Sequence, residues 1–446
     1  MSEPLSNLIG EVIHCADSEQ KSANVSVLLA QSDESETALL LESLPIDDRL
    51  ALWENLPVSK KLDVLIEMRS DPREVLIDAT SNEEWDSIFT DIDAEDLLEL
   101  ADSLSGELTE RAYAAMDKVQ RLHFAQANTY DEEQIGHWVT HDFLVLPLNA
   151  KVRDANRLLR REIPRHTDLI FLVNRSGQFS EAVEVGQIHA QPEHIPLVDL
   201  SLDDLPVVSA SQSCIEAAIA VQTSEYGALP VLDEQAKLVG RVDVTTAAEL
   251  THEHYERQLM ATAGMDEDED LFSPVRKSAK GRAIWLGINL LTAFLASAFI
   301  GLFEATLQQV VALAVLMPVV ASMGGIAGSQ TLTLVIRGLA LNQVSGANMR
   351  ALLVKELKVG GLNGVIWAVI IGLVAMMWFQ QPWLGAVIGI AILVNIVAAA
   401  LSGVLVPVVL EKFNIDPALS GSVILTTVTD IVGFVAFLGL GTALLL

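Results

Sequence analysis

The chain has 446 residues and a formal net charge of −31, a length that suggests about three domains and a charge that argues against binding to nucleic acid. Only nine of its 28 Lys and Arg residues and five of its 59 Asp and Glu residues follow residue 270, so residues 1–270 carry nearly all of the negative charge. Such a surface attracts cations, either as a hydrated face or at defined carboxylates. We find no phosphate-binding glycine loop, nucleophile elbow or zinc-ligand pair, which argues against an enzyme.

Residues 1–130 form an acidic region in which short apolar stretches alternate with turn residues. The run Leu41-Glu-Ser-Leu-Pro45 is echoed by Asn55-Leu56-Pro57, and a looser echo lies at 100–104. Short helices that cannot each bury an apolar face alone stack against one another, so we predict an all-α repeat domain. The first twenty residues lack the basic start and long apolar run of a signal peptide, and we expect this region to stay in the cytosol.

Residues 131–250 change to short apolar runs that alternate with helical stretches, a pattern typical of an α/β domain. Strands are predicted at 144–148, 169–173, 228–232 and 237–242, helices at 151–162 and 213–223, and turns at 175–177 and 233–235. The stretch from Tyr226 to Gly240 resembles the sensor module called a CBS domain, and 136–190 resembles a looser first copy. The resemblance implies two modules that pack as a pair.

Nucleotide-binding CBS modules commonly carry Gly-x-x-Thr-x-x-Asp. In the run that begins at Gly240, Asp243 stands at the threonine position and Thr246 at the aspartate position. This exchange weakens the case for ATP binding.

Residues 251–275 form an acidic connection. Glu253 and Glu256 fall at helical spacing, and the helix is predicted to end at Gly264, before an acidic run that begins at Asp266. These carboxylates form either a solvated face or a site for divalent cations. Glu253, Glu256 and Asp266 are the candidate metal ligands.

Residues 276–446 have the composition of a membrane domain. Five apolar stretches are each about as long as a bilayer-crossing helix requires: 283–303, 309–336, 359–379, 383–410 and 419–446. All nine basic residues of this half lie before the first stretch, between the second and third, or between the fourth and fifth. We therefore predict a protein of the cell inner membrane with a cytoplasmic N-terminus and the C-terminus outside.

Asp430 is the one acidic residue inside these five stretches. A carboxylate at mid-bilayer is costly unless it faces water, a cation or a proton pathway. Thr426 and Thr427 lie one turn before it and offer oxygen atoms, which hard cations prefer. We predict that Asp430 is a metal ligand; the alternative is a structural aspartate that is hydrogen-bonded to a neighbouring hydroxyl or amide.

The second apolar stretch carries a glycine-rich run after Pro318. Proline removes a backbone donor, and Gly324, Gly325 and Gly328 allow close backbone approach. Together with Gln330 they are candidates for lining a cation pathway through freed carbonyl groups. Packing between helices is the alternative, and glycines alone do not decide between the two.

The combination of these features resembles a known family. The repeated helices, the CBS pair, the acidic connection, the Pro318 to Gln330 run and Asp416-Pro-Ala followed by Thr-Thr-x-x-Asp430 look like an MgtE-type magnesium channel. The resemblance implies an all-α N-terminal repeat domain, an α/β tandem CBS pair and an all-α domain of five transmembrane helices. It implies a homodimer with a central pore, which Asp416 helps to line and in which Asp430 of each subunit holds a largely hydrated Mg2+. Regulatory Mg2+ would bind between acidic cytosolic surfaces and close the pore.

Two positions depart from the family pattern. Ile326 stands where the glycine run usually has Asn, and Ser422 stands where an Asn often follows the Asp-Pro-Ala stretch. Both changes remove amide oxygens near the implied pore. Transport of a divalent cation is therefore better supported than selectivity for Mg2+ over Mn2+, Co2+ or Ni2+.

Two other functions remain open from the residues alone. A secondary transporter could use Asp430 as a proton carrier for another solute. A receptor without transport activity could use the CBS pair to bind a cytosolic ligand.

Overall fold

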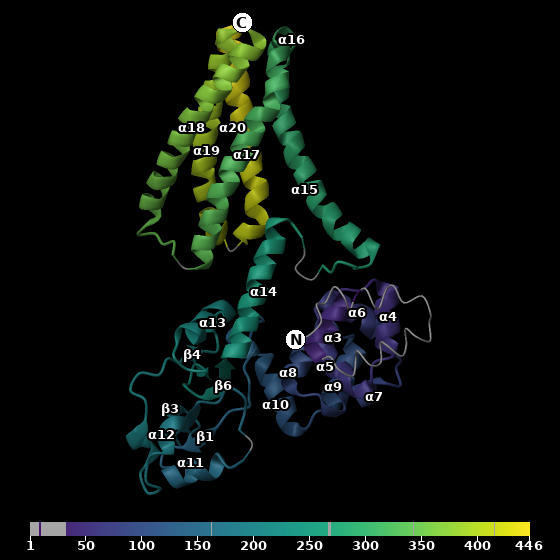
Figure 1. The fold of residues 1–446 in the computed structure, drawn as a ribbon, viewed down its shortest axis with the longest axis vertical. Coiled ribbons are helices and arrows are strands. Elements are labelled where there is room, and N and C mark those ends of the chain that lie inside the picture. Colours follow the sequence, from purple (N-terminus) through teal and green to yellow (C-terminus); the bar gives the residue numbers. More distant parts are fainter. Residues whose placement is uncertain (1–8, 10–32, 162, 266–268, 342, 414) are drawn as a thin grey trace. The chain divides into compact units, whose positions relative to one another are not determined.

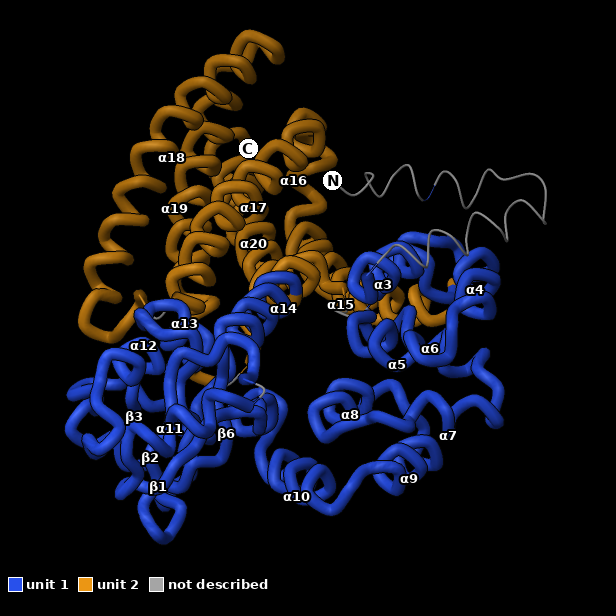
Figure 2. Tube along the Cα trace, turned by 60° about the horizontal axis from the view of Figure 1, so that its bottom comes forward, with its two compact units in different colours: residues 1–256, 268–274 blue, residues 257–267, 275–446 orange. Residues whose placement is uncertain are grey.

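The structure, a computed structural model, describes residues 9, 33–161, 163–265, 269–341, 343–413 and 415–446. Asp266, one of the predicted metal ligands, lies outside these residues. The chain divides into two compact units (Figure 2). Unit 1 comprises Met1–Glu256 with Asp268–Pro274, and unit 2 comprises Arg257–Glu267 with Val275–Leu446.

The first part of unit 1 is all-α, as predicted. Its helices are short because prolines or capping side chains begin most of them: Pro45 and Pro57 precede α4 and α5, and Asp33 and Asp117 accept backbone hydrogen bonds at the starts of α3 and α10. The elements are α3 (Glu34–Glu42), α4 (Ile46–Glu54), α5 (Val58–Ile66), α6 (Ser70–Ala79), α7 (Trp85–Ile88), η1 (Phe89–Asp91), α8 (Ala94–Leu100), α9 (Gly106–Ala115) and α10 (Lys118–Ala127).

One continuous core joins these short helices. Trp53 and Trp85 are each only 1% exposed within it, and the Trp53 Nε1–H donates to Thr80 Oγ1 at 2.9 Å. No single helix of this length buries its apolar face alone, so the stack forms as a whole.

The second part of unit 1 contains two small sheets with the same topology. In each sheet the first strand is parallel to the second, and the second is antiparallel to the third. The elements are η2 (Ile135–His137), β1 (Val145–Pro147), α11 (Val152–Leu158), β2 (Leu169–Val173), β3 (Phe179–Glu184), α12 (Val185–Ile188), η3 (Leu197–Leu200), β4 (Val208–Ser209), α13 (Cys214–Thr223), β5 (Ala228–Leu232) and β6 (Leu238–Asp243).

This repetition confirms the predicted pair of α/β modules. The two hairpins contain the predicted turns: Gly177, with a φ of 78°, ends the first, and Ala236, with a φ of 58°, directly follows the second. A separate apolar core lies beneath each sheet.

The connecting helix is longer than predicted. α14 (Val244–Thr262) begins directly after β6, seven residues before the predicted start at 251. The reason is the Asp243 carboxylate, which accepts hydrogen bonds from the backbone N–H groups of Thr245 and Thr246 and so begins the helix. Gly264, with a φ of 69°, follows its end.

Unit 2 contains five helices that are long and apolar enough to cross a membrane. They are α15 (Val275–Gly301), α17 (Val311–Ala340), α18 (Met349–Phe379), α19 (Pro382–Lys412) and α20 (Pro417–Leu445), with the short α16 (Glu304–Gln309) between the first two (Figure 1). The five predicted stretches are confirmed, but α18 begins ten residues before 359, and α16 was not predicted.

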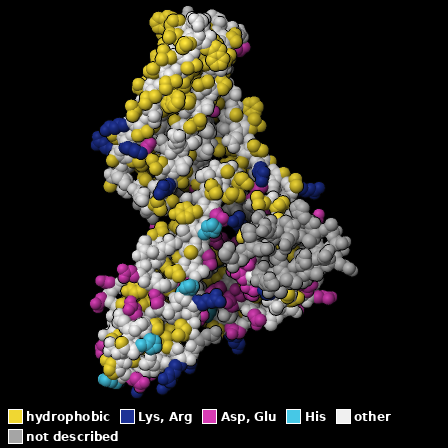
Figure 3. All heavy atoms as spheres, viewed as in Figure 1, with side chains coloured by type: hydrophobic (Ala, Val, Ile, Leu, Met, Phe, Trp, Pro, Cys, Tyr) yellow, Lys and Arg dark blue, Asp and Glu magenta, His cyan; other side chains and the backbone are white. Residues whose placement is uncertain are grey.

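The five helices are unequally buried. In the most apolar part of α19, 61% of the residues are buried inside unit 2, compared with 6% in α15. α19 is therefore the central helix, packed against α17, α18 and α20. On the face seen in Figure 3, hydrophobic side chains cover much of unit 2, whereas acidic side chains are frequent on unit 1.

Candidate cation pathway and carboxylate contacts

The Asp430 carboxylate has no partner among the described residues. It lies partly buried on α20, and the hydroxyls near it bond elsewhere. Thr426 Oγ1 donates to the backbone oxygen of Ser422 at 2.9 Å, and Thr427 Oγ1 donates to that of Val423 at 2.7 Å. The structural alternative, in which a neighbouring hydroxyl or amide compensates this charge, therefore finds no supporting contact in the described part of the chain.

The three predicted pathway glycines of α17 lie in two different environments. A Cβ atom at Gly324 would lie 2.2 Å from Asn395 Nδ2, and one at Gly328 would lie 2.9 Å from Leu425 Cδ1. These two glycines face neighbouring helices, so close packing accounts for them. Gly325, by contrast, has no atom within 4 Å of its Cβ position.

Gly325 and Gln330 line an open groove of about 670 Å³ on unit 2, whose walls are Ser322, Gly325, Ile326, Ser329, Gln330 and Thr333. All six residues lie on α17. The groove has small and hydroxyl-bearing residues at several positions, but Ile326 adds an apolar side chain that is 57% exposed. Of the four predicted pathway residues on α17, Gly325 and Gln330 therefore border a groove and the other two do not.

Asp416 caps a helix. Its Oδ1 accepts a hydrogen bond from the backbone N–H of Ala418 at 2.7 Å, and Pro417 occupies the first turn of α20. This contact orients the start of the helix that carries Asp430. This hydrogen bond gives no evidence that Asp416 lines a pore.

Sequence reasoning missed a second acidic residue of unit 2. Glu356 on α18 is only 4% exposed, accepts a hydrogen bond from Thr331 Oγ1 at 3.3 Å and pairs with Lys355 Nζ at 2.5 Å. The predicted third span began at 359, after the charged residues, so Glu356 was assigned to a loop. The spacing of the charged residues before 359 gave no sign that α18 begins ten residues earlier, at Met349.

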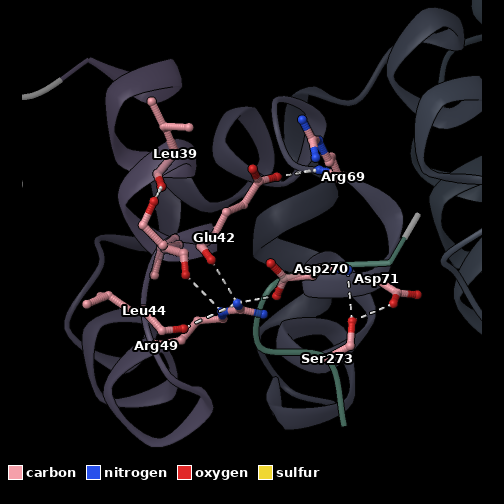
Figure 4. Close-up of polar contacts among 10 residues, drawn as sticks. Leu39, Glu42, Leu44, Arg49, Arg69, Asp71, Asp270 and Ser273 are labelled. Carbon is pink, nitrogen blue, oxygen red and sulfur yellow. Dashed lines mark hydrogen bonds and ion pairs between the residues drawn. The ribbon is translucent and has the colours of Figure 1, made fainter. Parts of the chain in front are cut away.

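Two acidic residues of the connection contact arginines of the helical region in unit 1. Arg69 Nη2 lies 2.9 Å from both carboxylate oxygens of Glu256 on α14. Asp270 accepts from Arg49 Nη2 at 2.5 Å (Figure 4). Glu253, the third described candidate, lies on the same helix as Glu256.

The two ion pairs differ in exposure. The side chains of Arg69 and Glu256 are 49% and 37% exposed, but those of Arg49 and Asp270 are 0% and 7% exposed. Arg49 also donates to the backbone oxygens of Leu41, Glu42 and Leu44 at the end of α3. The buried pair is thus part of a network, whereas the exposed pair is screened by solvent.

The segment of residues 269–274 is held on the helical region by more than one contact. Ser273 Oγ donates to Asp71 Oδ2 at 2.7 Å and accepts from the backbone N–H of Asp270 at 2.9 Å (Figure 4). Beside it, burial raises the pKa of Glu42, an effect that the backbone N–H of Arg69 opposes. α15 begins at Val275, directly after this segment.

Among the described residues, no group of three His, Cys, Asp or Glu side chains comes together in a way that could hold a metal ion. Within each unit, the predicted ligands Glu253, Glu256 and Asp430 therefore belong to no such group.

The chain matches three protein-family models. Residues 32–133 match the MgtE intracellular N domain, residues 197–251 match the CBS domain, and residues 317–440 match MgtE, described as a divalent cation transporter. The CBS match covers the second module; the first has the same strand order.

Curated relatives match along most of the chain. The magnesium transporter MgtE of Bacillus subtilis is 26% identical over 413 residues, which cover 91% of this chain and 90% of that protein. The magnesium transporter MgtE of Thermus thermophilus is 25% identical over 447 residues, which cover 96% and 99%. A crystal structure of the cytosolic domain of the Mg2+ channel MgtE in complex with ATP is 17% identical, covers 55% of this chain and 98% of that one, and has a TM-score of 0.46.

The family is one of transporters, which agrees with the expectation that the chain is not an enzyme. The five apolar helices and the relatives together make it a membrane protein. The chain belongs to the MgtE family of divalent cation transporters.

Proposed function

We propose that this chain forms a Mg2+ channel in which Asp430 binds the permeating, largely hydrated ion. The observation that carries the proposal is a carboxylate in a membrane-crossing helix that no described residue neutralises. A cation is the simplest compensation for such a charge, and Mg2+ suits it because this ion keeps most of its water and uses few direct carboxylate ligands. The relatives named above are magnesium transporters.

The experiment is Mg2+ uptake in a cell that lacks its own magnesium transport. Asp430→Ala should reduce uptake by at least about 100-fold, because the carboxylate that we propose to bind the permeating ion is removed. Glu411→Gln, which neutralises an exposed carboxylate at the end of α19, should transport normally. Normal uptake by Asp430→Ala, with equal amounts of protein in the membrane, would end the assignment.

The two alternatives predict different results in the same system. Uptake that follows a pH gradient and ignores Mg2+ would favour a proton-coupled transporter of another solute. Purified protein in liposomes that passes no ion would favour a receptor. Parallel measurements with Mn2+, Co2+ and Ni2+ would settle the selectivity that Ile326 and Ser422 leave open.

The assembly and orientation follow from the same proposal. Two copies would place two Asp430 carboxylates around one ion, so we propose a homodimer. The basic residues at one end of the spans support our proposal of a cytoplasmic N-terminus and an outer C-terminus in the cell inner membrane. We retain the division into 1–130, 131–250, 251–275 and 276–446 as the working map of domains. Asp243 is engaged at the start of α14, which supports the view that ATP binding at the Gly240 run is doubtful.

We infer further that cytosolic Mg2+ regulates the channel by competing with Arg69 for Glu256. The exposed pair is weak, and a divalent ion between Glu256 and other acidic groups, Glu253 included, can replace it. Asp270 differs, because burial with Arg49 keeps water and ions away from it. Glu256 is therefore the regulatory candidate, and Asp270 is an anchor for the segment before α15.

Limited proteolysis of the full chain tests this division. Glu256→Gln should lose the Mg2+-dependent part of its protection, whereas Asp270→Asn should be cleaved faster at every Mg2+ concentration. Asp86→Asn, which breaks the Arg111 pair inside the helical region, is the control and should behave as the unmodified chain. An unchanged Mg2+ response in Glu256→Gln would contradict the regulatory role.

A further inference from the structure

Asn395 is a fully buried polar residue in the central helix of unit 2. Its side chain, on α19, is 0% exposed. The Nδ2 group donates to the backbone oxygen of Val320 on α17 at 2.8 Å. The Oδ1 atom is buried and has no hydrogen-bond partner among the described residues.

Two neighbouring helices make room for this amide with glycines. A Cβ atom at Gly324 on α17 would lie 2.2 Å from Asn395 Nδ2, and one at Gly433 on α20 would lie 2.6 Å from the same atom. Real Cβ atoms do not approach this closely, so any side chain at either position displaces the amide. Asn395 therefore lies in a notch between α17 and α20.

The notch adjoins both halves of the proposed cation pathway. Gly433 follows Asp430 by three residues, which is about one helical turn. Gly324 directly precedes Gly325, which borders the groove on α17. One side chain thus contacts the helix that carries the carboxylate and the helix that carries the groove.

The stability of the fold alone does not explain why position 395 carries a polar residue. Leucine has the same number of side-chain heavy atoms as asparagine in the same branched arrangement, and it would avoid burying an unpaired amide oxygen in a membrane domain. Sequences violate local packing rules mainly where function requires it. We therefore attribute the presence of asparagine at this position to its amide group and not to its volume.

We propose that Asn395 is a positioning residue for permeation: it fixes the separation and rotation of α17 and α20, and with them the place of Asp430 relative to the groove. The proposal rests on the channel function proposed above. Asn395 is not assigned as an ion ligand. Its effect passes through Val320, Gly324 and Gly433, which it contacts.

The first test removes the amide and keeps the number and branching of the side-chain heavy atoms. Asn395→Leu should lower the maximal rate of Mg2+ uptake at least about tenfold, while the protein remains in the membrane with an unchanged oligomeric state. Asn395→Asp should restore much of the rate, because a carboxyl group that stays protonated in this apolar site can donate to the Val320 oxygen. A normal rate in Asn395→Leu would overturn the proposal.

The second test separates positioning from packing. Gly324→Ala alone should reduce the amount of folded protein, because its Cβ meets the amide. Adding Asn395→Ala should restore the folded protein, since it removes the clash, but not the transport rate. If the double variant transports normally, packing is the whole role of Asn395 and the proposal is wrong. Gly439→Ala, on α20 with no atom within 4 Å of its Cβ position, is the control for an added methyl group.

The two proposals fail separately. If Asp430→Ala transports normally, the channel assignment fails whatever Asn395 does. If Asp430→Ala is inactive and Asn395→Leu is normal, the channel assignment stands and only the positioning role is lost.

Discussion

Units 1 and 2 each contain a polar side chain that is completely buried, Arg49 and Asn395, and they stabilise it in opposite ways. Arg49 in unit 1 is charged, and it donates hydrogen bonds to three backbone oxygens and forms an ion pair with the Asp270 carboxylate. Asn395 in unit 2 is neutral and makes one hydrogen bond, in a notch that glycines create. A water-facing region can supply a counter-charge for every buried charge, whereas a membrane region avoids charge and uses close packing instead.

Asp430 is an exception to this avoidance of charge in unit 2. It is charged, it belongs to unit 2, and no described residue pairs with it. Among the described residues, none supplies a positive charge or a hydrogen bond to Asp430. For this reason we assign that role to a passing cation. The following four predictions run from the largest expected effect to the smallest.

Removing the buried charge of unit 1 should have the largest effect. Arg49→Met keeps much of the side chain's length but leaves Asp270 buried without the arginine and removes one donor from each of three backbone oxygens. We expect a loss of about 3–5 kcal/mol in the stability of the docked segment. Thermal unfolding of the full chain measures it, with Arg111→Met as the control on a largely exposed pair. Equal effects of the two substitutions would remove the distinction between buried and exposed pairs.

Filling the notch of unit 2 should come next. Gly433→Ala places a methyl group 2.6 Å from the Asn395 amide, and we expect about 1–3 kcal/mol of overpacking. The measurement is the unfolding temperature of the detergent-purified chain, compared with Gly439→Ala. Equal unfolding temperatures for the two variants would mean that the helices can separate at little cost.

A pH effect should appear in unit 1. Burial, and next the Asp93 carboxylate, raise the pKa of Asp96 from 3.8 to about 6. Between about pH 4 and pH 6 the folded state therefore binds more protons than the unfolded state, so stability falls as the pH rises through this window. Because Asp96 is partly exposed, we expect a loss of about 1–2 kcal/mol.

Thermal unfolding of the full chain at several pH values checks this sign. Asp96→Asn keeps an oxygen that can accept from the Asp93 backbone N–H, and it should flatten the profile between pH 4 and 6. A profile that rises with pH in the unmodified chain and is unchanged in Asp96→Asn would refute the assignment.

The exposed ion pair should have the smallest effect. Arg69→Gln should cost at most about 1 kcal/mol, and less at high ionic strength, because solvent screens the pair with Glu256. The reversed pair, Arg69→Glu with Glu256→Arg, should recover the stability lost by either single reversal. A loss as large as that of Arg49→Met would show that this contact is not a surface pair.

Much of the fold could be predicted from local pattern. Leu169–Val173 and Ala228–Leu232 are short apolar runs between turn residues, and both form the predicted strands. The five apolar stretches form helices because their length and composition leave few other structures. The start of α18 was missed, since the charges around Glu356 resemble a loop until folding brings Thr331 of α17 next to Glu356.

The candidate site was only partly predictable. Asp430 is conspicuous in the sequence because no other acidic residue lies within an apolar stretch. Asn395 is not, because a single amide in an apolar helix carries no periodic signal. The three glycines and one glutamine predicted on α17 likewise cannot indicate which of them meet a neighbour.

The sequence alone determined the composition of each region, the number of membrane-crossing stretches and the isolated carboxylate, because these depend on local hydropathy and charge. Only the tertiary structure decided that Arg49 meets Asp270 across 221 positions and that Asn395 enters a notch between Gly324 and Gly433. Such contacts join residues that are distant in the chain. They exist only when whole helices are packed, so no local pattern encodes them.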